Sequence, residues 1–213
     1  LEIRERLAGR KEIALITLDD ATRKNSKKRK EALNAADFVI LCLPDEAARE
    51  AAGLVRSNRT RLIDASSAHR VAEGWTYGFP EMDKDQRAAI VASGRVTNPG
   101  CYATSILLGC LPLFQAGLVE GPRLIIDAKS GLSGAGRKAD ESLLFTEMTE
   151  NLRAYKVNQH QHMPEVTQAI RHLTGRDSDA LRDTRRSGKT GSGRRRRFTS
   201  DGGTDVLKLQ TDA

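Results

Sequence analysis

One of the three cysteines in the sequence has the surroundings of a nucleophile. Cys101 follows Asn98-Pro99-Gly100 and directly precedes an apolar segment, residues 102–116, that predicts a helix. The unpaired N–H groups and the positive dipole end of a helix N-terminus favour a thiolate. A thiolate there can attack a carbonyl carbon, and the neighbouring N–H groups can hold the resulting oxyanion. The alternative is a buried, inert cysteine, which is the interpretation we favour for Cys42 and Cys110.

A histidine-containing segment, His160-Gln161-His162-Met163-Pro164-Glu165, offers an acid and base for such a thiol. Pro164 and Glu165 suit the first turn of a helix, so His162 is expected just before it, where a partner can orient the ring. A histidine near a thiolate can accept a proton and then return it. A metal site at the two histidines lacks a third ligand nearby, so no metal is predicted. Without Cys101, a polar loop with exposed histidines would be the better interpretation.

Two further segments follow predicted strands and suit an anionic ligand. In the loop Ser130–Arg137, backbone N–H groups and Arg137 could hold a phosphate, although a tight turn explains the glycines equally well. Asp64–Arg70 follows another strand, and ligands bind at the carboxyl ends of parallel strands. Arg70 beside small hydroxyl residues suits an anionic substrate. Polar capping of the turn explains that segment at least as well.

A basic run, Arg23–Lys30, follows the apolar residues 13–18. In a nucleotide-binding fold this location is close to the ribose 2′ position, where positive charge favours NADP over NAD. A solvated loop explains the run equally well, and Asp19 and Asp20 argue mildly against the phosphate site.

Short apolar runs alternate with helical patterns along the first 170 residues, which predicts an α/β fold with a doubly wound parallel sheet. The predicted strands are residues 13–18, 38–43, 61–65, 95–97 and 124–128. The predicted helices are residues 28–36, 45–56, 83–93 and 102–116, an amphipathic helix at the very start with Leu1, Ile3 and Leu7, and one beginning near Pro164. The face of the 45–56 helix formed by Ala48, Ala52 and Val55 is expected to be buried.

Composition excludes several classes of protein. No run approaches 18 uncharged apolar residues, so no transmembrane helix is expected, and the charged first residues indicate no secretory signal. Three cysteines without a CxxC pair predict neither a disulfide framework nor a zinc cluster, and therefore a cytoplasmic setting. Residues 171–213 carry +5 of the net charge of +7. This tail, with Arg194–Arg197, suggests nucleic-acid binding as an alternative, which the few aromatic residues of the body do not favour.

Taken together, these segments resemble the N-acetyl-gamma-glutamyl-phosphate reductases, the arginine-biosynthesis branch of the semialdehyde dehydrogenase group, and especially their shorter type. The resemblance covers about residues 1–170 and rests on five segments in the same order. The five segments are Asp64–Arg70, Tyr77–Glu81, Asn98–Thr104, Ser130–Arg137 and His160–Glu165.

The resemblance implies a fold, a reaction and partners. The fold is an incomplete Rossmann-like NADP-binding domain over residues 1–119, and part of an α+β catalytic and dimerisation domain over residues 120–170. The reaction is the NADPH-dependent reduction of an acyl phosphate, N-acetyl-gamma-glutamyl phosphate, to the semialdehyde, with release of phosphate. A homo-oligomer is also implied.

The resemblance also implies residue roles. Cys101 forms the thioester, His162 is the acid and base, and Glu165 orients His162. The implied substrate-binding residues are Asn98, Arg70, Ser130, Gly131, Tyr155 and His160. The residues expected to bind the cofactor are Ser66, Ser67, Gly134, Gly136 and Arg23.

Both ends of the chain depart from the family pattern. Members begin with a strand and a Gly-rich turn that hold the cofactor pyrophosphate, and after the position of Gln168 they continue with further strands and a final helix. We therefore expect a chain truncated at its start and frame-shifted near residue 170. Residues 171–213 are expected to be disordered, because so polar a segment cannot offset the entropy of ordering. An inactive remnant of the reductase is the alternative to an active enzyme.

Overall fold

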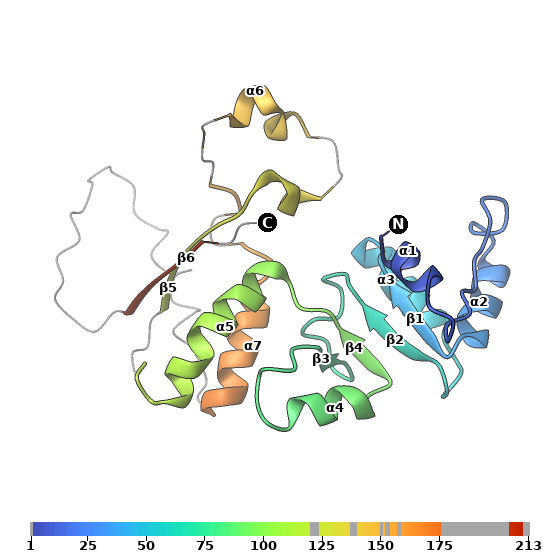
Figure 1. Ribbon diagram of the computed structural model, residues 1–213, viewed down its shortest axis with the longest axis horizontal. Coiled ribbons are helices and arrows are strands. Elements are labelled where there is room, and N and C mark those ends of the chain that lie inside the picture. Colours follow the sequence, from blue (N-terminus) through green and yellow to red (C-terminus); the bar gives the residue numbers. More distant parts are fainter. Residues whose placement is uncertain are drawn as a thin grey trace. The chain divides into compact units, whose positions relative to one another are not determined.

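The computed structural model describes residues 2–119, 124–136, 140–149, 151, 154–156, 159–175 and 205–210 (Figure 1). The chain forms two compact units. Unit 1 comprises Leu1–Gly78 and Ala88–Asn98, and unit 2 comprises Phe79–Arg87 and Pro99–Ala213. This division differs from the boundary expected near residue 120, because helix α5 (Cys101–Gln115) packs against helix α7 (Met163–Thr174).

Unit 1 contains a four-stranded parallel sheet, which confirms the predicted α/β class. Its strands are β1 (Phe38–Leu41), β2 (Arg61–Asp64), β3 (Thr76–Tyr77) and β4 (Arg95–Thr97), in the order β1-β2-β4-β3. Leu41 pairs with Asp64, and Asp64 with Thr97, so the carboxyl ends of three strands lie level. The residues that follow these strands therefore share one edge of the sheet.

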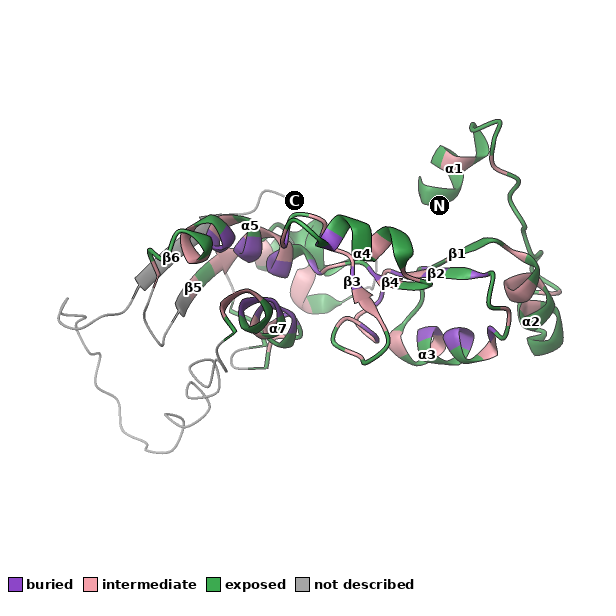
Figure 2. Cartoon of the chain, turned by 90° about the horizontal axis from the view of Figure 1, so that it is seen from below, coloured by how far each residue is buried: buried purple, intermediate pink, exposed green. Residues whose placement is uncertain are grey.

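Helices lie on both faces of this sheet. α3 (Asp45–Leu54) connects β1 to β2, while α4 (Gln86–Ala92) connects β3 back to β4 in the opposite direction across the sheet. Because such connections are right-handed, the reversal places α3 and α4 on opposite faces (Figure 2). The core on the α3 side contains Leu41, Ala51, Ala52, Val55 and Leu62. Ala48 is buried as well, which confirms the predicted apolar face of this helix.

The remaining helices of unit 1 are α1 (Glu2–Ala8) and α2 (Ser26–Ala35). Asn25 caps α2, since its side-chain oxygen accepts from the N–H groups of Lys27 and Lys28. The cap and the helix agree with the helix predicted over residues 28–36.

The strand predicted over residues 13–18 is wrong. This segment has no strand structure, and the Ile16 side chain is 55% exposed. An apolar run becomes a strand only where neighbours satisfy its backbone groups and cover its faces. Among the residues that the structure describes, β1 is the edge of the sheet and nothing pairs with the segment.

Two smaller differences concern strand ends. Cys42, expected inside a strand, lies exposed just after β1. Strand β3 was not predicted, because two residues are too few to show a periodic pattern.

Unit 2 is built around α5 and α7, whose apolar faces are buried. The buried residues are Tyr102, Ala103, Ile106, Leu107, Cys110 and Leu111 of α5, and Glu165, Val166, Ala169 and Ile170 of α7. The other elements are β5 (Leu124–Lys129), the 3-10 helices η1 (Leu132–Ala135) and η2 (Glu141–Leu143), α6 (Phe145–Met148) and β6 (Asp205–Gln210).

The tail expected to be disordered differs from that expectation where the structure describes it. α7 continues to Thr174 and ends at Gly175, whose φ of 62° suits the left-handed cap of a helix. Residues 205–210 form β6, which pairs in parallel with β5. Residues 176–204 and 211–213, including Arg194–Arg197, lie outside the described residues. None of the helices in the described ranges is long and apolar enough to cross a membrane.

Replacing Leu62 should test where the core of unit 1 lies. Leu62 is 1% exposed and packs among the core residues. We expect Leu62→Ala to lower the free energy of unfolding by about 2–5 kcal/mol, because it removes apolar contacts and leaves a cavity. Val91→Ala, at a position 65% exposed, serves as the control and should change it by no more than about 0.5 kcal/mol. Urea unfolding followed by circular dichroism measures both, and equal effects would contradict the assignment.

Candidate active site

Cys101 is the first residue of α5 and is exposed. Gly100 is the N-cap residue, and intrahelical bonding begins where the Thr104 N–H donates to the Gly100 carbonyl at 2.9 Å. The N–H groups of residues 101–103 therefore have no intrahelical acceptor and lie at the positive end of the dipole. The predicted location of the thiol at a helix N-terminus is confirmed.

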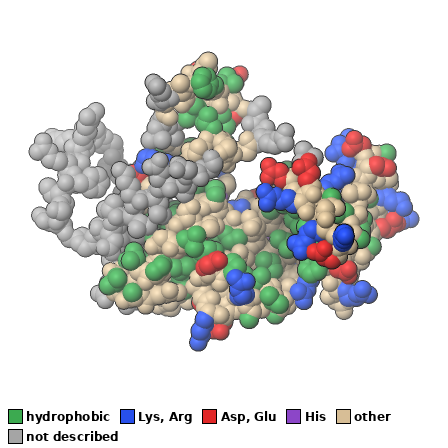
Figure 3. All heavy atoms as spheres, viewed as in Figure 1, with side chains coloured by type: hydrophobic (Ala, Val, Ile, Leu, Met, Phe, Trp, Pro, Cys, Tyr) green, Lys and Arg blue, Asp and Glu red, His purple; other side chains and the backbone are tan. Residues whose placement is uncertain are grey.

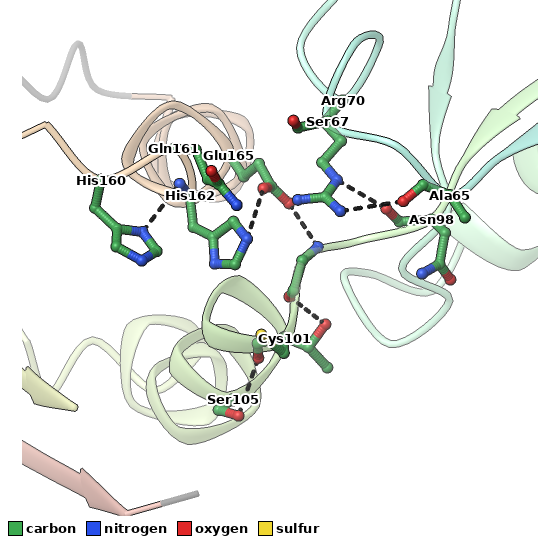
Figure 4. Close-up of polar contacts among 12 residues, drawn as sticks. Ala65, Ser67, Arg70, Asn98, Cys101, Ser105, His160, Gln161, His162 and Glu165 are labelled. Carbon is green, nitrogen blue, oxygen red and sulfur yellow. Dashed lines mark hydrogen bonds and ion pairs between the residues drawn. The ribbon is translucent and has the colours of Figure 1, made fainter. Parts of the chain in front are cut away.

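Glu165 links the beginning of α7 to the loop that carries Cys101. Its carboxylate is buried, and Oε2 accepts a hydrogen bond from the Gly100 N–H at 2.9 Å (Figure 4). Its other oxygen, Oε1, lies 3.9 Å from Nε2 of the buried His162. The Gly100 N–H is therefore engaged, and an oxyanion beside Cys101 would have to use the N–H groups of residues 101–103.

Three rings gather around Tyr102, the residue after Cys101. The Tyr102 ring centroid lies 5.2 Å from that of His160, 6.0 Å from His162 and 6.5 Å from Tyr155. The Tyr155 hydroxyl lies 3.1 Å from His160 Nε2, and the His162 backbone N–H donates to His160 Nδ1 at 3.2 Å. The structure thus brings Tyr155, His160 and His162 around Tyr102, the residue after Cys101, and brings Glu165 to Gly100, the residue before it.

These contacts define the protonation of His160. Burial and the positive charge of Lys156 lower its pKa, which favours the neutral ring. Because Nδ1 accepts the backbone N–H, the single ring proton belongs on Nε2 and is donated to the Tyr155 oxygen. Partial burial and the neighbouring Tyr102 raise the pKa of Tyr155, so its hydroxyl stays protonated.

In unit 1, Arg70 and Asn98 meet at the carboxyl edge of the sheet. Arg70 Nε donates to the Asn98 carbonyl at 3.1 Å, and Nη2 donates to the Ala65 carbonyl at 3.4 Å (Figure 4). The guanidinium is thereby tied to the backbone that follows β2 and β4. These bonds reduce the number of rotamers open to a long side chain.

Ser66 and Ser67, in the turn after β2, both donate to carboxylates. Ser66 Oγ donates to Asp64 Oδ2 at 2.8 Å, and Ser67 Oγ donates to Asp45 Oδ2 at 2.8 Å. His69 also contacts Asp64, a feature that the sequence analysis missed. The available signal was a strand-ending aspartate followed five residues later by a histidine.

The loop after β5 is less open to a phosphate than expected. Ser130 and Gly131 are exposed, and η1 follows them. The Gly134 N–H donates to the Gly131 carbonyl at 3.2 Å, and the Gly136 N–H donates to the Ser133 carbonyl at 3.1 Å. Both glycine N–H groups are thus used within the turn, which corrects the expectation that consecutive N–H groups face a ligand. Arg137 lies outside the described residues.

Arg23 is exposed and pairs with Asp20 at 2.9 Å. Lysine and arginine side chains are mixed with acidic ones over α1 and α2 (Figure 3). The basic run is therefore partly neutralised, as Asp19 and Asp20 had suggested. The contacts of the structure do not bring Arg23 to Ser66 or Ser67.

The far end of α7 is held by a hydrogen bond whose contribution to stability should depend on pH. His172 Nε2 donates to Asp83 Oδ2 at 2.7 Å, and this hydrogen bond lowers the pKa of Asp83 in the folded protein. The resulting stabilisation is complete above the ordinary aspartate pKa of about 4, and is lost as the pH falls through the lower folded-state pKa. We expect the free energy of unfolding of the wild type to fall more steeply in this acid range than that of His172→Gln. Urea unfolding at a series of acid pH values measures this. If the free energy of unfolding of both proteins fell equally steeply with pH, the contribution of the contact between His172 and Asp83 would be contradicted.

Thiol alkylation should distinguish the three cysteines. Cys101 and Cys42 are exposed, whereas Cys110 is buried and burial raises its pKa to about 11. We expect iodoacetamide to modify Cys101 first, because its thiol is exposed beside the backbone N–H groups that begin α5, and Cys42 more slowly. Cys110 should react only after denaturation. Peptide mass spectrometry over time measures all three, and faster modification of Cys42 than of Cys101 would contradict an activated thiol.

Comparisons with known proteins show which family the chain resembles. Residues 5–90 match the family model "Semialdehyde dehydrogenase, NAD binding domain", and residues 101–181 match "Semialdehyde dehydrogenase, dimerisation domain". The N-acetyl-gamma-glutamyl-phosphate reductase of Burkholderia lata is 48% identical over 172 residues, which are 78% of this chain and 54% of the relative. N-acetyl-gamma-glutamyl-phosphate reductase 2 of Pseudomonas putida is 45% identical, over 79% of this chain and 55% of the relative. The chain thus spans about half the length of these relatives.

Among solved structures, aspartate semialdehyde dehydrogenase II of Vibrio cholerae, complexed with ASA, has a similar fold. Its TM-score is 0.50 at 13% sequence identity, with 84% of this chain and 52% of that chain covered. The two domain models, the identities of 45–48% and this fold agree with one another. The chain belongs to the semialdehyde dehydrogenase family, as a relative of the N-acetyl-gamma-glutamyl-phosphate reductases.

Proposed function

We propose that this chain carries the catalytic machinery for the NADPH-dependent reduction of N-acetyl-gamma-glutamyl phosphate to its semialdehyde, the activity named for its relatives. The observation that carries the proposal is the exposed Cys101 thiol at the first position of α5, next to a loop fixed by the buried Glu165. An acyl phosphate is a suitable partner for such a thiol, because phosphate is a good leaving group.

In the first step, Cys101 Sγ attacks the acyl carbon and the thiol proton passes to His162. The bond between the acyl carbon and the phosphate oxygen then breaks, which gives a thioester on Cys101 and free phosphate. The N–H groups of residues 101–103 stabilise the negative charge that develops on the carbonyl oxygen. Splitting the reaction through a covalent intermediate replaces one difficult step with two easier ones.

His162 is favoured over His160 as the acid and base. Both ring nitrogens of His160 are engaged, one by the His162 backbone N–H and one by Tyr155. The buried His162 ring faces the Glu165 carboxylate, which stabilises the imidazolium formed when His162 takes the proton. We propose that Tyr155 hydrogen-bonds the substrate, and that His160 takes part in substrate binding by orienting the Tyr155 hydroxyl.

The residues at the carboxyl edge of the unit 1 sheet fit the nicotinamide end of NADP. The hydroxyl protons of Ser66 and Ser67 are donated to carboxylates, so both oxygens act as acceptors. The Ser66 oxygen already accepts the Ala68 N–H at 3.1 Å, so the Ser67 oxygen is the better acceptor for an amide group. Arg23 would hold the 2′-phosphate, and Gly134 and Gly136 would line the cofactor from the loop after β5. When bound, NADPH supplies the hydride that reduces the thioester.

We also propose that the protein forms a homo-oligomer and works in the cytoplasm. The match of residues 101–181 to a dimerisation domain supports a homo-oligomer. The names of the relatives support a small-molecule acyl phosphate as substrate. A cytoplasmic, reducing setting would keep Cys101 a free thiol. Nucleic-acid binding by residues 171–213 and an inactive remnant of the reductase are the alternatives.

The reverse reaction tests the proposal. Purified protein receives N-acetyl-glutamate semialdehyde, phosphate and NADP, and NADPH formation is followed by absorbance. We expect turnover in the wild type, and a loss of more than about a thousandfold in Cys101→Ser, because the thioester cannot form. Cys42→Ser, a second exposed cysteine, is the matched control and should retain activity. A folded wild type without turnover would favour the inactive remnant, and turnover in Cys101→Ser would contradict the mechanism.

A further inference from the structure

Asp64, at the end of β2, is a fully buried carboxylate with several donors around it. Its Oδ1 accepts the Ser66 N–H at 2.9 Å, and its Oδ2 accepts the Ser66 hydroxyl at 2.8 Å. His69 Nδ1 lies 2.5 Å from the same Oδ2. A buried carboxylate is tolerated only when such donors replace its water. The turn after β2 is therefore folded around this charge.

His69 is held from two directions. Nδ1 carries the proton toward Asp64, since an ionised carboxylate can only accept, and the imidazole stacks on Trp75 with ring centroids 4.1 Å apart and planes inclined by 16°. The side chain is buried between these contacts. None of the reaction steps proposed above uses this ring.

The same turn leads directly into Arg70. It is anchored at its start, where the Ala65 N–H donates to the Leu41 carbonyl at 2.9 Å, and in its middle by the bonds from Ser67 to Asp45. His69 anchors its far end, one residue before Arg70. The Arg70 guanidinium then donates to the carbonyls of Ala65 and Asn98.

We infer that His69 is a positioning residue, which fixes the turn after β2 so that Arg70 is held ready for the phosphate group of the substrate. The inference rests on the proposed function, and it assigns His69 no contact with substrate. An arginine already ordered by its backbone loses less conformational entropy when it binds an anion. Removing the hydrogen bond between His69 and Asp64 should therefore weaken anion binding more than it slows the chemical step.

Two variants separate the two contacts of His69. His69→Phe keeps a ring to stack on Trp75 but removes the donor to Asp64, whereas His69→Asn keeps an N–H near the position of Nδ1 and removes the ring. Val71→Ala, at an exposed position in the same segment, is the matched control. We expect His69→Phe to raise KM for the acyl phosphate about tenfold with kcat lowered less than about threefold, and His69→Asn to restore most of KM.

A purely structural role would produce a different pattern. It would lower the folded fraction, and so the apparent kcat, while KM of the remaining folded enzyme stayed at the wild-type value. That pattern, or an unchanged KM in His69→Phe, would overturn the inference. Trp75 is the single tryptophan of the chain, so its emission reports directly whether each variant keeps the stack.

A binding measurement distinguishes failure of this inference from failure of the proposed function. Isothermal titration of the full chain with inorganic phosphate requires no turnover. We expect binding in the wild type, about tenfold weaker binding in His69→Phe, and loss of binding in Arg70→Ala. This pattern supports the positioning role even if no variant reduces the acyl phosphate. Equal binding in the wild type and His69→Phe, or no binding in the wild type, would overturn it.

Discussion

The contact between the Glu165 carboxylate and the Gly100 N–H is the constraint on which the candidate site depends. A carboxylate that is 1% exposed has lost its water and must receive hydrogen bonds from the protein. Here the donor is the N-cap residue of α5, 65 residues earlier in the chain. The same side chain also faces His162, so Glu165 contacts both the residue that precedes Cys101 and the histidine before α7.

A second buried carboxylate organises unit 1 in the same way. Asp64 accepts donors from Ser66 and His69, and thereby shapes the turn that carries Ser66, Ser67 and Arg70. In both units a loop with candidate site residues is formed around an acidic side chain, which is the last residue of β2 in unit 1 and lies in the first turn of α7 in unit 2. Each loop is short, polar and partly exposed, so hydrophobic packing alone would leave it poorly defined.

The two histidines before α7 illustrate how neighbours differentiate identical side chains. His160 accepts a backbone N–H, donates to Tyr155 and lies near the positive charge of Lys156, and its pKa is lowered. His162 is buried and faces a carboxylate instead. Two residues only two positions apart therefore have different surroundings, and we propose the acid and base role only for His162.

Local sequence signals were enough for most of the helices and for the placement of Cys101, His162 and Arg70. Periodicity, Pro164 and the small residues of α3 act over a few positions, so they can be interpreted without the fold. Only the tertiary structure decided that residues 13–18 remain outside the sheet, that the Gly100 N–H binds Glu165, and that His69 binds Asp64. A strand needs neighbours to satisfy its backbone, and a buried carboxylate needs donors from wherever the chain returns, so both depend on contacts that no local pattern contains.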